Sequence, residues 1–271
     1  MSLLFASTLA WSYPLGTVLE IAAEEQMDGV EIWAEHVWRF NETPAEIHQK
    51  LEQLDLTATL HAASWDLNLC ALNEGIRRQS IQEVKNSIDL AEQLGADNVT
   101  FHPGRLSLPG IAYSLHEDLL ALSLEAITDY ALERDIVVSL EIMEEKPKEF
   151  VTEAHLMNRI IEGFPPYLQT TFDVAHVPIH LDSREVFEEM NQVGKIHISD
   201  ATKQTLHLPL GEGTIGKDTL TYFLQNKYVP VVLEGLDRSK DLIWLRKNLQ
   251  YIRENIPFFQ RRTKIEHLSY E

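Results

Sequence analysis

Short apolar runs alternate with longer amphipathic stretches along the whole chain. Eight runs of mostly apolar residues predict strands at residues 3–9, 29–34, 57–62, 98–102, 137–142, 168–172, 195–199 and 231–234. Most of these runs are continuous rather than alternating, which is typical of strands that are buried on both faces of a parallel sheet. The pattern therefore predicts eight buried parallel strands.

The stretches between these runs have the spacing of amphipathic helices. Residues 78–94 place their apolar side chains on one side and stop before Gly95, a residue suited to a helix C-cap. Residues 115–134 repeat the same spacing. The segment 43–46 combines a threonine, a proline and an acidic residue in the order that begins helices, and a glycine introduces a helix over 216–227. Each predicted strand is thus followed by helical sequence.

Eight strand–helix units in about 255 residues, without a low-complexity linker, predict a (β/α)8 TIM barrel. The whole chain, residues 1–271, then forms a single TIM-barrel domain in which 258–271 are a C-terminal extension. This extension would cap the barrel, contact a partner subunit or simply pack at the terminus. The competing fold, a doubly wound open sheet, needs a glycine-rich phosphate turn after an early strand, and the sequence contains none.

Side chains able to bind a metal stand at the end of every predicted strand from the third to the eighth. They are His61, His102, Glu141, Asp173, His197 and Glu234. The active site of a parallel barrel forms at these strand ends, and converging carboxylates are costly to bury without a cation. A divalent metal is therefore expected. Mixed carboxylate and imidazole ligands favour Mn or Zn, with Mg, Co and Fe as further candidates.

Further polar and aromatic residues fall near the predicted barrel mouth. His176 follows Asp173 by three residues, and the glycine-containing segment 203–213 brings Lys203 and His207 close to the seventh strand. These three side chains would contact substrate or an additional metal, or be ordinary loop residues. Glu31 in the second strand would support the site by hydrogen bonding to a ligand. Four tryptophans form either an apolar wall for a sugar-like ligand or plain core: Trp11, Trp33, Trp38 and Trp65.

The charge balance narrows the choice of partners. The chain has 42 acidic and 23 basic residues, a formal net charge of −19, so a nucleic acid would meet net repulsion. Cys70 is the one cysteine, and no run approaches the length of a membrane span, so we expect a cytoplasmic protein that binds no membrane. A small-molecule substrate fits this composition best. A homodimer would be the commonest assembly.

Four motifs together resemble those of the xylose isomerase-like TIM barrels. They are Phe101-His102-Pro103-Gly104, Phe172-Asp173-Val174-Ala175-His176, His197-Ile198-Ser199-Asp200 and Leu208-Pro209-Leu210-Gly211-Glu212-Gly213. The resemblance extends over nearly the whole chain, from Gly29 to Gly235. It implies a TIM barrel related to sugar phosphate isomerases and epimerases and to endonuclease IV.

The epimerase branch of this group implies one metal held by the four residues Glu141, Asp173, His197 and Glu234. The two glutamates there also form the acid–base pair. The arginine that contacts substrate in those epimerases is replaced here by Lys203.

Endonuclease IV implies a larger ligand set around three zinc ions. Eight of its positions match this chain at His61, His102, Glu141, Asp173, His176, His197, His207 and Glu234. A further aspartate of that set falls on Thr205, and the loop before His207 is shorter. This missing carboxylate favours one metal.

The leading hypothesis is a metal-dependent isomerase or epimerase of a small polyol, keto-sugar or sugar phosphate. Glu141 and Glu234 would move a proton next to a carbonyl that the metal polarises. The alternative is an endonuclease IV-like multi-zinc phosphodiesterase. A third class, a carbohydrate-binding barrel without catalysis, does not require two carboxylates on one metal.

Overall fold

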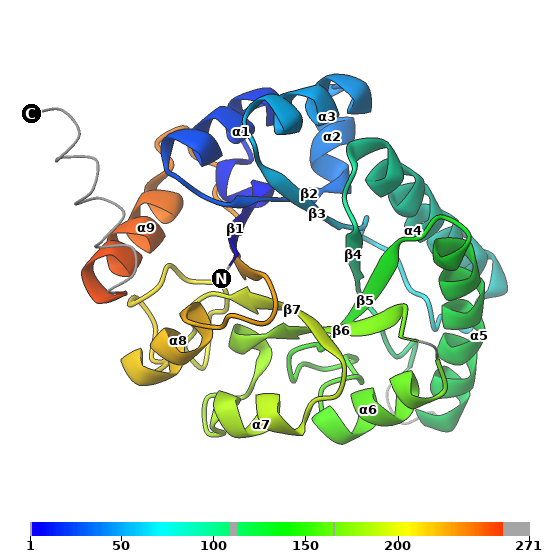
Figure 1. The fold of residues 1–271 in the computed structure, drawn as a ribbon. Coiled ribbons are helices and arrows are strands. Elements are labelled where there is room, and N and C mark those ends of the chain that lie inside the picture. The colour runs from blue at the N-terminus through cyan, green and yellow to red at the C-terminus, as the bar shows by residue number, and fades with distance from the viewer. Residues whose placement is uncertain (1, 109–112, 165, 257–271) are drawn as a thin grey trace, which may run out of the picture.

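The computed structural model describes residues 2–108, 113–164 and 166–256, and within them eight parallel strands close into a barrel. The strands pair in chain order, and β1 closes the ring against β8 (Figure 1). Their bounds are β1 Leu3–Ala6, β2 Gly29–Trp33, β3 Thr57–His61, β4 Asn98–Phe101, β5 Val137–Glu141, β6 Leu168–Asp173, β7 Val193–Ile198 and β8 Val231–Leu233. The predicted TIM barrel is therefore confirmed.

Helices surround the barrel and cover the outer faces of its strands (Figure 1). They are α1 Leu15–Glu24, α2 Ala34–Phe40, α3 Pro44–Gln53, α4 Glu74–Leu94, α5 Tyr113–Leu132, α6 Ala154–Glu162, α7 Ser183–Glu189, α8 Lys217–Leu224 and α9 Ile243–Asn255. The main core lies between these helices and the strands, where residues such as Phe5, Ile32 and Leu60 are fully buried. As the sequence predicts, α4 ends at Gly95, which adopts a left-handed conformation.

The first strand is shorter than predicted. β1 ends at Ala6, and residues 7–10 form the 3-10 helix η1 (Ser7–Ala10) instead of continuing the strand. Ser7 Oγ accepts a hydrogen bond of 3.1 Å from the Trp33 amide, and Thr8 Oγ1 donates one of 2.7 Å to the Gly235 carbonyl. These contacts of two polar side chains with residues far along the chain hold the chain in a turn here.

Four helices also differ from the prediction, since α4 begins at Glu74 rather than at 78 and α5 spans 113–132 rather than 115–134. α2 is an additional helix between β2 and α3, and α8 ends at Leu224, three residues before the predicted end. The predicted extension 258–271 lies outside the described residues.

Alternate residues of each strand point into the barrel, where a polar layer lies beneath the strand ends. Thr59 Oγ1 donates to Glu31 Oε2 at 2.9 Å, and Lys195 Nζ contacts the same oxygen. Lys195 also donates to Thr100 Oγ1 at 2.9 Å, and the Thr100 and Thr171 hydroxyls lie 2.7 Å apart. This layer spans the barrel from β2 to β7. It supports the side chains two residues further along each strand, which share the same face.

No helix in the described ranges 2–108, 113–164 and 166–256 is long and apolar enough to cross a membrane.

Candidate metal centre

Four predicted ligands converge at the carboxyl ends of consecutive strands. Glu141 and Asp173 are the last residues of β5 and β6, His197 is the penultimate residue of β7, and Glu234 directly follows β8. One potential ligand atom from each of the four lies within 4.8 Å of the others. We call these four residues the inner set. Its geometry suits one divalent cation.

His197 is oriented by a carboxylate in the polar layer. Glu31 Oε1 lies 2.7 Å from His197 Nε2, and both residues are fully buried. His197 Nδ1 therefore faces the inner set, 3.0 Å from Glu234 Oε2 and 3.4 Å from Glu141 Oε1. Burial would lower the pKa of His197, but Glu31, Glu234 and Glu141 raise it well above its ordinary value. The contact with Glu31 agrees with the supporting position expected from the sequence.

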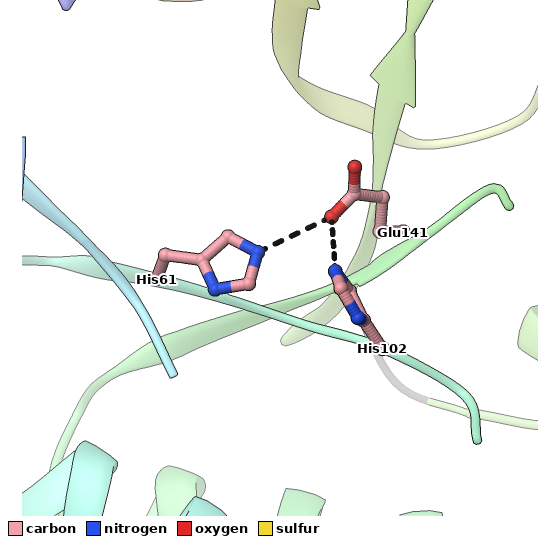
Figure 2. A group of neighbouring side chains, drawn as sticks. All are labelled: His61, His102 and Glu141. Atoms are coloured by element: carbon pink, nitrogen blue, oxygen red, sulfur yellow. Dashed lines mark hydrogen bonds and ion pairs between the residues drawn. The ribbon is translucent and has the colours of Figure 1, made fainter. Parts of the chain in front are cut away.

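His61 and His102 both approach the remaining oxygen of Glu141 (Figure 2). Their Nε2 atoms lie 3.4 Å and 3.2 Å from Glu141 Oε2. His61 Nδ1 donates to the Ala62 carbonyl at 2.8 Å, which fixes the direction of its Nε2. Burial would raise the pKa of Glu141, but the imidazoles of His197, His102 and His61 hold it well below its ordinary value. His61, His102 and Glu141 form a second group of potential metal ligands.

A third group of potential ligands lies beside Asp173. His176 Nδ1 donates to the Ile142 carbonyl at 2.8 Å, so its Nε2 faces Asp173 Oδ2 at 3.7 Å. His207 Nδ1 lies 3.9 Å from the same oxygen and 3.2 Å from Ser199 Oγ. Burial would lower the pKa of His176, but surrounding carboxylates, that of Asp173 foremost, raise it to about 9. Burial lowers the pKa of His207.

The inner set fits a cation because three of its buried carboxylate oxygens accept no hydrogen bond in the described part of the chain. Within the described residues, Glu141 Oε1, Asp173 Oδ2 and Glu234 Oε2 are buried without a hydrogen-bond partner. Burial raises the pKa of Asp173 well above its ordinary value, and the carboxylates of Glu234 and Glu141 add to this effect. Leaving such groups unpaired costs free energy, which a divalent ion would recover.

A cavity of about 330 Å³ opens above the inner set. Glu141, Glu234, His102, His176 and His207 line it from the barrel side. The lining also contains Trp33 at the end of β2, Trp65 and Trp244. A volume of this size is typical of a small-molecule site.

The other residues predicted from the sequence differ in whether they line this cavity. Trp33 stacks on His61 with ring centroids 4.0 Å apart, and Trp11 packs edge-on against Trp65 at 5.4 Å. Trp38 is exposed and lies outside the cavity lining. Lys203 is exposed in the loop after β7 and also lies outside that lining.

Sequence reasoning missed several residues of the site. Arg105 and Glu144 line the cavity from the loops after β4 and β5, and Trp244 lines it from the first turn of α9. No strand pattern marks such loop positions. The polar layer had a signal, because Thr59, Thr100 and Lys195 each stand two residues before a predicted ligand and so share its face of the strand.

Comparison with known proteins finds distant relatives that align with most of the chain. The chain is 24% identical over 211 residues to an uncharacterized protein of Methanocaldococcus jannaschii, covering 76% of this chain and 77% of that protein. It is 23% identical over 245 residues to a protein of Haloquadratum walsbyi named probable endonuclease 4, covering 81% and 86%.

Solved structures superpose over nearly the full length. A D-tagatose 3-epimerase-like protein matches with a TM-score of 0.81 and 21% identity, covering 97% of this chain and 100% of that one. The 3-keto-D-glucoside 4-epimerase of E. coli matches with a TM-score of 0.77 and 17% identity, covering 93% and 97%. A family model described as xylose isomerase-like TIM barrel matches residues 19–262. The chain therefore belongs to the xylose isomerase-like TIM barrel family.

Proposed function

We propose that the chain is a divalent-metal-dependent isomerase or epimerase of a keto-sugar or related polyol. The observation that carries this proposal is the inner set, whose four ligand atoms lie within 4.8 Å of one another. Two of its members, Glu141 and Glu234, also line the cavity above it. A substrate in this cavity would meet both carboxylates and the metal together. Mn and Zn remain the favoured ions for such mixed ligands.

Glu141 and Glu234 would transfer the proton. The metal would supply Lewis acidity that polarises the substrate carbonyl. Burial would raise the pKa of Glu234, but His197 and His207 hold it below its ordinary value, so this carboxylate is ionised as a base must be. Glu141 is kept ionised by its own imidazole neighbours. Glu141 stands at the end of β5 and Glu234 directly after β8, so the two carboxylates reach the substrate from different strands. One would remove the proton next to the carbonyl, and the other would return it.

The histidines at the cavity wall would hold the substrate. His176 and His207 line the cavity and present imidazole nitrogens to it, which suits hydrogen bonds to sugar oxygens. His61 and His102 fix the second oxygen of Glu141, and this would keep the carboxylate aimed during proton transfer. A substrate contact by Lys203 stays a prediction.

The test is solvent exchange of the transferred proton. Protein loaded with Mn²⁺ or Zn²⁺ is incubated with a panel of keto-sugars in deuterated water, and deuterium next to the carbonyl is measured by NMR. Exchange is expected for at least one sugar and is expected to be lost in Glu141→Gln and in Glu234→Gln. Glu145→Gln is the matched control, because this exposed carboxylate lines a neighbouring cavity instead. Retained exchange in either active-site variant would contradict the assignment of Glu141 and Glu234 as the proton-transfer pair.

A multi-metal phosphodiesterase is the second candidate, favoured by the two further ligand groups. His61–His102–Glu141 and Asp173–His176–His207 each bring three ligand atoms within 4.8 Å. Two or three ions would activate water and neutralise a phosphate. Metal analysis separates the candidates: one ion per chain supports the isomerase, and two or three with cleavage of a phosphodiester support the nuclease. The formal charge of −19 argues against a polyanionic substrate.

A further inference from the structure

We propose that the cavity selects an uncharged keto-sugar over its phosphate ester, and that Glu144 is the residue that determines this specificity. The inference rests on the proposed function with one divalent ion at the inner set. It narrows the substrate class to sugars whose free end carries a hydroxyl. Three features of the cavity wall lead to it.

The cavity wall carries more negative than positive charge. Glu141, Glu144 and Glu234 line it, and Asp173 lies beneath as the third carboxylate of the inner set. One divalent ion on the three carboxylates of the inner set leaves one negative charge, and Glu144 adds a second. His176, whose pKa is raised to about 9, contributes one positive charge, so the wall stays net negative. A phosphate ester would therefore approach a centre of the same sign, and like charges at close range are disfavoured.

The positive side chains of the wall already face carboxylates: His176 Nε2 lies 3.7 Å from both Glu144 Oε2 and Asp173 Oδ2. Within the described residues, Arg105 is the one lysine or arginine that lines this cavity. Its Nε lies 2.8 Å from Glu149 Oε1, and the Glu149 side chain is only 7% exposed. A phosphate at the other guanidinium nitrogens would have to share the charge of Arg105 with this buried carboxylate, and the nearby negative charge of Glu149 weakens that attraction. Arg105 is thus a poor phosphate site.

Glu144 offers the cavity an unused hydrogen-bond acceptor. One of its oxygens, Oε1, lies 2.6 Å from Lys146 Nζ, and the Lys146 side chain is 57% exposed on the outer side. The other oxygen, Oε2, is buried without a hydrogen-bond partner within the described residues, 3.7 Å from His176 Nε2. An ionised carboxylate accepts hydrogen bonds and donates none. A sugar hydroxyl can donate to it, whereas a phosphate dianion cannot.

Two basic side chains flank this carboxylate, His176 on the side of the inner set and Lys146 at its other oxygen. The lining also includes Trp65, Trp244 and Leu236, whose apolar surface suits the C–H face of a sugar.

The experiment compares an uncharged ligand with its phosphate ester. A hexitol and the same hexitol carrying one terminal phosphate are titrated calorimetrically into protein loaded with one Mn²⁺ per chain. The wild type is expected to bind the hexitol at least about tenfold more tightly than the ester, a difference of roughly 1.4 kcal/mol. Glu144→Gln should shrink that ratio about tenfold. Glu145→Gln removes the same charge one residue away, outside this cavity, and should leave the ratio unchanged.

The outcomes separate this inference from the proposed function. Equal or tighter binding of the ester by the wild type, an unchanged ratio in Glu144→Gln, or no binding of the hexitol would overturn the inference. If the hexitol is preferred but no keto-sugar exchanges its proton in deuterated water, charge selection stands and the proposed chemistry fails. Tight binding of inorganic phosphate with two or three ions per chain would overturn both.

Discussion

Replacing Lys195 by methionine should destabilise the barrel from within. Lys195 is fully buried, and its ammonium contacts Glu31 and donates to Thr100 Oγ1 at 2.9 Å. Methionine keeps most of the volume but leaves the Glu31 carboxylate without this cation. Breaking a buried ion pair typically costs about 3–5 kcal/mol. Because Glu31 keeps its contacts with Thr59 at 2.9 Å and His197 at 2.7 Å, we expect the lower end, about 3 kcal/mol.

Urea denaturation of the chelator-treated protein measures this loss as a change in the free energy of unfolding. The double variant Lys195→Met/Glu31→Gln should recover most of it, since no buried charge is then left unpaired. Lys247→Met is the control, because Lys247 is 44% exposed and lies 2.5 Å from Glu212, a surface pair worth below about 1 kcal/mol. A Lys195→Met variant within about 1 kcal/mol of the wild type would refute the reasoning.

Chelation should lower the melting temperature, and Mn²⁺ at about a hundred times its Kd should restore roughly 2.7 kcal/mol of the free energy of unfolding. A melting temperature that does not change with the metal would contradict the metal site. Burial raises the pKa of the Cys70 thiol to about 12, so a thiol reagent at pH 8 should modify it only after unfolding, as mass spectrometry would show. In Gly213→Ala the new Cβ would lie 2.3 Å from Asp200 Oδ1 and displace the loop that carries His207, reducing stability by about 1–3 kcal/mol in urea titrations. Gly216→Ala, whose Cβ meets no atom within 4 Å, should leave stability nearly unchanged.

The barrel could be predicted because its signal is local and repeated. Each strand is a short apolar run followed by helical sequence, and eight repeats leave few alternatives. The end of β1 could not be predicted this way. The predicted strand extends to Leu9, but contacts of Ser7 and Thr8 with Trp33 and Gly235 turn the chain at Ala6. These partners are distant in sequence.

The inner set could be predicted because a closed parallel barrel gathers its strand ends at one edge. Which nitrogen of His197 faces the site could not, since that depends on Glu31 across the barrel. Arg105 and Glu144 stand in loops, whose paths depend on packing rather than on periodicity.

The sharing of ligands between groups makes the centre a linked system. Glu141 belongs both to the inner set and to the group with His61 and His102, and Asp173 belongs both to the inner set and to the group with His176. An ion taken up by one group therefore changes the charge and orientation of a ligand in the next. Successive binding constants would then be coupled, and a metal titration would deviate from independent sites. A change at the edge of the centre, such as a carboxylate at Thr205, would alter the outer occupancy while the inner set keeps its ligands.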